Sequence, residues 1–247
     1  MSKLRPLIIL AGLLAIWQAV VWLTGAPRYI LPAPWEVGLA IVENWQRLAH
    51  HAGITLTEIL LGLLLGSLLG VASALSLAAF RPARRWLLPV LVTSQAIPVF
   101  ALAPILVLWL GYGMTSKVAM AALIIYFPVT AAFYDGLRRS EPGWLDLAQT
   151  MGAGRYATLR HIRIPAALPA LTSGLRVATA VAPIGAVVGE WVGASAGLGF
   201  LMDNANDRMQ IDLMFAALFV LAVLAVGLYF LVDRLCRNMI PWQTESH

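Results

Sequence analysis

The chain has 247 residues, of which 60% are hydrophobic and only 12% are charged, and its mean hydropathy is +0.81. Soluble domains carry about 25% charged residues, so this chain has too little charge to cover the surface of a water-soluble enzyme. The composition also excludes a disordered chain, which needs low hydrophobicity and high charge. The single cysteine, Cys236, excludes an intramolecular disulfide framework.

Six apolar stretches predict membrane spans, because a helix needs about 20 apolar residues to cross the bilayer core. They are residues 7–24, 53–80, 87–111, 118–137, 170–194 and 213–232. The stretches are apolar on every face, whereas strands of a membrane β-barrel alternate in polarity. The sequence therefore predicts an all-α, polytopic membrane helical bundle with six transmembrane helices. A cleaved signal peptide at 7–24 is the weaker alternative, because no A-x-A site follows that stretch.

The basic residues predict how the bundle is oriented. With the N-terminus in the cytoplasm, 12 Lys and Arg residues fall on the inner side, four on the outer side, and Arg176 lies within a span. This asymmetry follows the positive-inside rule and places both termini in the cytoplasm. The net charge of +5 is thereby explained as a topological signal, and no nucleic acid partner is expected.

The spans divide the chain into three regions. Residues 1–52 are an N-terminal transmembrane helix with an outer segment, and residues 53–237 are a core transmembrane domain. That core contains a cytoplasmic loop at 138–168, and residues 238–247 form a short cytoplasmic tail.

Two glycine ridges and several prolines mark the core spans. Glycines four residues apart share one helix face and allow close backbone approach, either within one subunit or at a subunit interface. The ridges are Gly62, Gly66 and Gly70 in the second span, and Gly185, Gly189, Gly193 and Gly197 at the fifth. Prolines that kink helices are Pro98 and Pro104 in the third span, Pro128 in the fourth and Pro183 in the fifth.

Few polar side chains lie inside the spans. Gln95 lies in the third span, and Arg176 and Glu190 lie in the fifth. Ionisable residues at membrane depth are candidates for a substrate path or gate, so we assign Gln95, Pro98, Arg176 and Glu190 to the path or gate. The alternative is that Arg176 and Glu190 extend to the interfaces. Glu58, near the outer end of its span, is expected to be hydrated.

Motifs for catalysis and cofactor binding fail in their context. The G-x-S-x-G pattern at 193–197 needs a strand-to-helix turn and a histidine base, and all four histidines lie outside the spans. The G-x-G-x-x-A pattern at 152–157 has no preceding strand, and 111–117 lacks the glycine and hydroxyl residue of a phosphate loop. His50 and His51 have no Cys or carboxylate at metal spacing. No enzyme activity, cofactor or metal is expected.

The cytoplasmic loop at 138–168 carries five arginines and predicts two short helices. One begins near Pro142, a favourable first helical position, and Gly152 ends it. A second segment covers 155–162, and Pro165 and Pro169 are expected to close the loop. Such a pair is suited to docking a partner.

This loop resembles the EAA motif of ABC importer permeases, which reads E-A-A, three residues, G, nine residues, I-x-L-P. The chain has Asp146-Leu147-Ala148, then Gly152 at the right spacing, then Ile162-Arg-Ile164-Pro165. Asp146, Leu147 and Ile164 replace the Glu, the first Ala and the Leu of the motif.

The resemblance implies a type I ABC importer permease fold, a multi-pass location in the bacterial inner membrane, and no ATPase site in this chain. Its implied partners are two copies of a separate ATPase subunit, a periplasmic or lipoprotein solute-binding protein, and a second permease copy in a homodimer. The residues expected to contact the ATPase are Asp146, Leu147, Ala148, Met151, Gly152, Arg155, Ile162 and Pro165.

The stretch from Gln95 to Gly113 and the later Gly189-Glu190-Trp191 are similar to the nitrate, sulfonate, taurine and thiamine-precursor branch of these permeases. They are most similar to hydroxymethylpyrimidine permeases, which implies a pyrimidine solute. Aliphatic sulfonate, taurine or nitrate is the alternative solute. A secondary transporter is a more distant alternative, although it predicts inverted repeats and midplane carboxylates.

Overall fold

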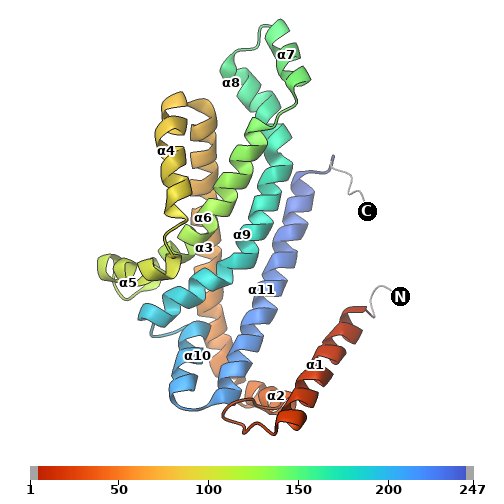
Figure 1. Ribbon diagram of the computed structural model, residues 1–247, viewed down its shortest axis with the longest axis vertical. Helices are drawn as coiled ribbons and strands as arrows, with labels where there is room; N and C mark the ends of the chain where they lie inside the picture. Colours follow the sequence, from red (N-terminus) through yellow and green to blue (C-terminus); the bar gives the residue numbers. More distant parts are fainter. Residues whose placement is uncertain (1–4, 243–247) are drawn as a thin grey trace.

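The computed structural model describes residues 5–242, except for the side chains of residues 5–7 and 10. All regular elements in this part of the chain are helical. Lys3 and residues 243–247 of the predicted tail lie outside it. Figure 1 shows long helices running roughly along one axis, with α7 and α8 projecting at one end and α2 and α10 gathered at the other.

Within residues 5–242, four helices are long and apolar enough to cross a membrane. Helix α3 covers Trp45–Ala79 and α6 covers Met114–Arg138. Helix α9 covers Ile164–Gly193 and α11 covers Ile211–Met239. These helices confirm the second, fourth, fifth and sixth predicted spans, and α3 passes through the predicted domain boundary at residue 52.

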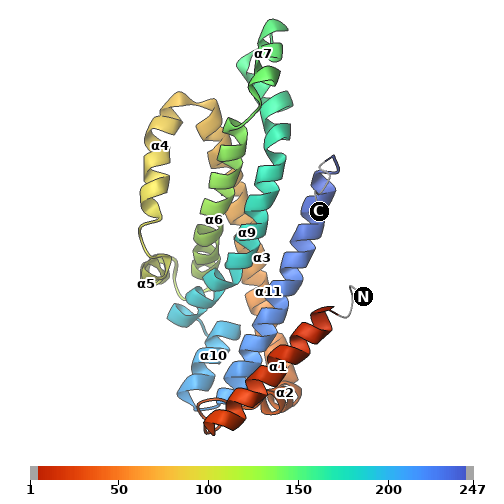
Figure 2. The same ribbon diagram turned by 45° about the vertical axis from the view of Figure 1, so that its right-hand side comes forward.

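The first predicted span corresponds to α1, which covers Arg5–Thr24. The part of this helix that follows its last undescribed side chain, Ala11–Thr24, is apolar but shorter than a complete span. That span therefore stays a prediction. After α1 the chain turns into α2, Pro34–Glu43, which lies at the outer end of the molecule (Figures 1 and 2).

The third predicted span, 87–111, is wrong as a single helix. Helix α4 covers Arg81–Ser94 and α5 covers Val99–Leu110, and the two are bent by 104°. Pro98 accounts for the bend because it disfavours helical backbone in the residue before it. Figures 1 and 2 show α4 running beside the bundle, and Figure 1 shows α5 lying across the direction of α4.

Helix α6 is the centre of the bundle and packs against both α3 and α9. The α3 glycines approach it closely, with Gly66 against Ala122 and Ile125. Gly185 of α9 reaches Ala121 from the other side. The α3 ridge and the Gly185–Gly189 part of the second ridge therefore pack against α6 within one subunit, whereas Gly193 lies against Val107 of α5 and Gly197 lies against Glu190. Between α3, α6 and α9 lies a core that includes Ile125, Val129 and Phe133.

The outer surfaces of α3 and α11 are rich in exposed aliphatic and aromatic side chains. Leu64 and Leu68 of α3 are 59% and 61% exposed, and Val226 and Phe230 of α11 are 56% and 65% exposed. Apolar surfaces of this extent are rare on soluble monomers. They support placing the long helices in a lipid bilayer.

The fifth span begins earlier than expected. Helix α8, Arg155–Thr158, continues through a π-helical turn, Leu159–Arg163, into α9. Pro165 lies in the first turn of α9, where its missing N–H is tolerated, and Pro169 lies inside the helix. The expectation that these prolines close the loop is therefore wrong, and one helical run joins Arg155 to Gly193.

Candidate functional site

The cytoplasmic loop contains a short helix with a defined end. Helix α7 covers Pro142–Thr150, with Pro142 at its first position as predicted. Gly152 has φ +73°, and the N–H of Ala153 donates to the carbonyl of Ala148 at 2.9 Å. The N–H of Gly152 donates to Gln149 at 3.0 Å. These two bonds form a Schellman motif, which needs a left-handed residue after the helix; Gly152 supplies it.

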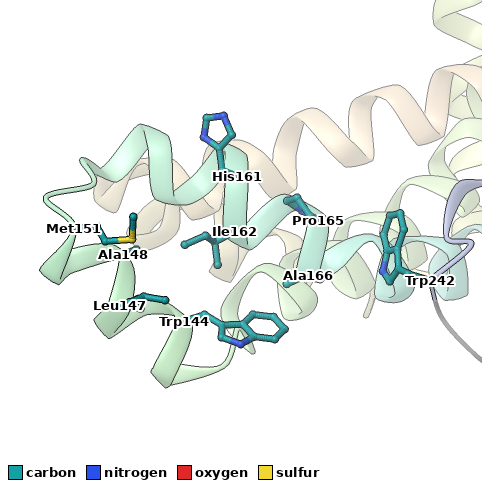
Figure 3. A pocket seen from close by; sticks show the side chains of 9 residues that line it. All are labelled: Trp144, Leu147, Ala148, Met151, His161, Ile162, Pro165, Ala166 and Trp242. Carbon is teal, nitrogen blue, oxygen red and sulfur yellow. The ribbon is translucent and has the colours of Figure 1, made fainter.

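Between α7 and the start of α9 lies a pocket of about 410 Å³ (Figure 3). Five of the residues predicted to contact the ATPase line it: Leu147, Ala148, Met151, Ile162 and Pro165. Ala148 is buried, whereas Leu147 is 59% exposed and Met151 is 77% exposed. An exposed apolar surface beside five arginines is suited to a protein partner, because interfaces combine an apolar centre with a polar rim.

The other three predicted contacts lie around this pocket. Asp146 and Arg155 are exposed and do not line it, and Gly152 forms the turn between α7 and α8. Sequence reasoning missed Trp144, His161, Ala166 and Trp242, which complete the lining. The position of Trp144 one turn before Ala148 on the same helix was a usable signal, whereas Trp242 comes from beyond α11.

The residues assigned to a path or gate are not brought together. Gln95 and Pro98 flank the bend between α4 and α5 and are exposed. Arg176 and Glu190 are 14 residues apart on α9, which is roughly 21 Å along a helix. Arg176 pairs with Asp233 of α11 at 2.7 Å, and Asp233 also pairs with Arg237.

Glu190 lies in a buried polar cluster at the outer end of the bundle. Its side chain is 1% exposed, so it does not extend to the interface. The hydroxyl of Thr55 donates to Glu190 Oε1 at 2.6 Å, and the N–H of Gly199 donates to Oε2. Thr55 is on α3, and Gly199 is in the first turn of α10, Leu198–Asp207.

Glu58 and His51 belong to the same cluster. Glu58 was expected to be hydrated, but it is fully buried and lies 3.0 Å from the ammonium group of Lys117 on α6. His51 Nδ1 accepts a hydrogen bond of 3.0 Å from the N–H of Gly197. The expectation for Glu58 is wrong because α6 brings a cation beside it, and a buried charge is retained when it is paired.

The segment that carries the G-x-S-x-G pattern, 193–197, joins the end of α9 to α10. The strand-to-helix turn that a nucleophilic serine requires is therefore not the structure of this segment. Its glycines serve packing: Gly197 has φ +123°, and a side chain there would collide with the carboxylate of Glu190.

The chain matches one family model over residues 62–243, that of the binding-protein-dependent transport system inner membrane component. It is 56% identical to a "Probable ABC transporter permease protein" of Haemophilus influenzae, over 96% of this chain and 97% of that one. It is 36% identical to the formylaminopyrimidine transport permease ThiX of Halalkalibacterium halodurans, over 99% and 98% of the two chains.

Other relatives carry different solutes in their names. The riboflavin transport system permease RibX of Chloroflexus aurantiacus is 39% identical, over 94% of this chain and 88% of that one. The taurine transport permease TauC of Escherichia coli is 30% identical, over 96% and 88%.

The fold is also found among solved structures. An inward-facing structure of the MetNI methionine ABC transporter matches with a TM-score of 0.64 at 20% identity, over 84% of this chain and 97% of that one. This match confirms the predicted permease fold. The chain belongs to the binding-protein-dependent transport system inner membrane component family and is a permease subunit of an ABC importer in the inner membrane.

Proposed function

We propose that this permease imports a small solute that an outer binding protein delivers, and that it forms the path as a homodimer driven by two copies of a separate ATPase. The observation that carries the proposal is the exposed apolar pocket on the cytoplasmic loop. Residues predicted from the sequence to contact an ATPase line it together. Gly152, in the left-handed backbone conformation, lies in the turn between α7 and α8.

For the solute, we favour a pyrimidine of the hydroxymethylpyrimidine type, a precursor of thiamine. The similarity to the formylaminopyrimidine permease extends over nearly the whole of both chains. The similarity to the riboflavin permease favours a second candidate, a flavin, whose ring system also contains a pyrimidine ring. A planar nitrogen heterocycle is common to both, whereas taurine, aliphatic sulfonates and nitrate share no such ring.

The ATPase partnership is tested by co-purification with the neighbouring ATPase. Gly152→Asp adds a negative charge to the docking surface and places a side chain at a left-handed backbone position that favours glycine. The matched control is Gly143→Asp in the same loop, because Gly143 has open space around it and lies in the first turn of α7. We expect Gly152→Asp to weaken ATPase recovery and Gly143→Asp to leave it unchanged.

The result that would overturn the proposal is a wild-type chain with which no ATPase associates. Solute uptake into vesicles that persists with a proton gradient and no ATPase would establish the secondary transporter instead. The solute class is tested separately by measuring binding of hydroxymethylpyrimidine, riboflavin, taurine and nitrate to the binding protein encoded beside this chain. Tight binding of taurine or nitrate alone would reject the heterocycle assignment.

A further inference from the structure

The first turn of α10 is held by side chains from the membrane bundle. The N–H of Gly197 donates to His51, and the N–H of Leu198 donates to the Thr55 hydroxyl at 2.8 Å. The N–H of Gly199 donates to Glu190. The first N–H groups of a helix have no partner within it, so here they are satisfied by α3 and α9. The start of α10 is therefore attached to two helices at once.

Glu190 is the residue that joins these attachments. One of its carboxylate oxygens accepts the Thr55 hydroxyl of α3, and the other accepts the Gly199 N–H of α10. Thr55 is fully buried. Since it donates to Glu190 and accepts from Leu198, the hydroxyl is used in both directions. Water cannot replace these bonds without opening the cluster, because the atoms are excluded from solvent.

Lys117 attaches the same segment to α6. Its ammonium group lies 3.0 Å from the Glu58 carboxylate and 3.4 Å from the carbonyl of Ala196. Ala196 belongs to the turn between α9 and α10. The outer parts of α3, α6 and α9 are thus joined by directional polar contacts to α10 or to the turn that precedes it.

The start of α9 lies at the pocket beside α7 on the cytoplasmic loop. The helical run from Arg155 to Gly193 has 39 residues, which corresponds to about 58 Å. Ile162 and Pro165 near its start line the pocket, and Glu190 lies in its last turn. Figure 1 shows α9 running from the α7–α8 end of the molecule to α10. One element therefore connects the cytoplasmic docking surface with the outer polar cluster.

We propose that Glu190 and Thr55 are positioning residues of transport, because they fasten the outer end of α9 to α10 and α3 and so carry the signal between the outer face and the coupling loop. This inference rests on the proposed function, since it needs an ATPase on the loop and a binding protein outside. The fastening makes α10 move with α9. Releasing it leaves the ATPase bound but no longer responsive to the outer partner.

The test measures ATP hydrolysis by the complete complex in proteoliposomes, with and without its solute-binding protein. Thr55→Val removes the hydroxyl at nearly constant volume, and Glu190→Gln removes one of the two acceptors. Thr55→Ser keeps the hydroxyl and is expected to restore the wild-type response. Thr57→Val is the matched control, because Thr57 is exposed on the same helix and its hydroxyl donates to the carbonyl of Gly53 in its own preceding turn.

We expect Thr55→Val and Glu190→Gln to keep the basal hydrolysis rate and to lower its stimulation by the binding protein about tenfold. Full stimulation in both variants would overturn the inference. So would a wild-type complex that hydrolyses ATP but is not stimulated at all. A wild-type chain that recruits no ATPase contradicts the proposed function instead, so the two failures are distinguishable.

Hydrogen exchange tests the proposal on the wild-type complex, so its result does not depend on whether a variant folds. In the wild-type complex, the amides of Gly197, Leu198 and Gly199 are expected to exchange slowly, both at rest and with ATP and vanadate trapped on the ATPase. Fast exchange of these three amides in the trapped state would show that α10 is released from α9 when the transporter works, and would overturn the inference.

Discussion

Nε of Arg176 on α9 lies 2.7 Å from Oδ1 of Asp233 on α11, and this ion pair joins the two helices in the inner half of the bundle. The guanidinium is thus already engaged by a carboxylate of the same chain. Its side chain is 28% exposed and that of Asp233 is 15% exposed. The pair is therefore partly screened by its surroundings.

For this pair, we predict that Arg176→Gln lowers the unfolding temperature slightly and that Asp233→Asn lowers it further, because Asp233→Asn also removes the ion pair with Arg237. The double variant should be little worse than Asp233→Asn alone, because Arg176→Gln then removes no further interaction of this pair. Thermal unfolding of the purified permease in detergent measures all three. Additive losses would show that the two side chains contribute independently.

The buried pair of Glu58 and Lys117 should respond asymmetrically. Lys117→Met leaves Glu58 without its cation, and breaking a buried ion pair costs about 3–5 kcal/mol. Glu58→Gln should cost less, because Lys117 retains the carbonyl of Ala196 as a hydrogen-bond acceptor. Membrane-inserted yield and thermal unfolding of both variants measure the difference. A Lys117→Met variant as stable as the wild type would contradict this account of the cluster.

The close approach of α3 and α6 makes a further prediction. A Cβ at Gly66 would lie 2.8 Å from the carbonyl oxygen of Ala122 and 2.9 Å from Cβ of Ile125, so Gly66→Ala forces the helices apart. Overpacking of this kind costs about 1–3 kcal/mol. Gly53→Ala on the same helix is the control, since its site is open and alanine favours helix. We expect thermal unfolding at a lower temperature for the first and an unchanged or higher one for the second.

The apolar surface of α7 should contribute directly to ATPase affinity. Leu147→Asp places a charge on a side chain that is 59% exposed, so the permease itself should fold normally. Central apolar contacts at interfaces contribute about 2 kcal/mol or more, so we expect at least a roughly 30-fold weaker complex by titration with the purified ATPase. Glu141→Gln in the same loop lies outside the pocket and serves as the control. Equal affinities for the two variants would place the docking surface elsewhere.

Much of this architecture follows from local sequence patterns. Four spans, the helix that begins at Pro142 and the turn at Gly152 were predictable, because apolar length and the special backbone of proline and glycine act over a few residues. Five of the eight residues expected to contact the ATPase line one pocket, because the motif spacing places them on the two sides of one turn.

The outer cluster could not be predicted in the same way. Glu58 and Lys117 are 59 positions apart in the sequence, and Lys117 directly precedes the predicted span at 118–137. Its burial depends on how α3 packs against α6, which no local pattern encodes. The sequence gives no indication that Thr55 belongs to this cluster, since a threonine in an apolar helix usually bonds to its own preceding turn.

The bend between α4 and α5 has a consequence for how the chain enters the membrane during synthesis. With 14 and 12 residues, the two helices are about 21 and 18 Å long, and neither alone crosses a core about 30 Å thick. Neither α4 nor α5 alone therefore gives the translocon a segment long enough to span the bilayer. Helix α5 packs against α6 and α9, both of which follow it in the chain. Because α6 follows directly, the first of these partners becomes available as soon as α5 has been made.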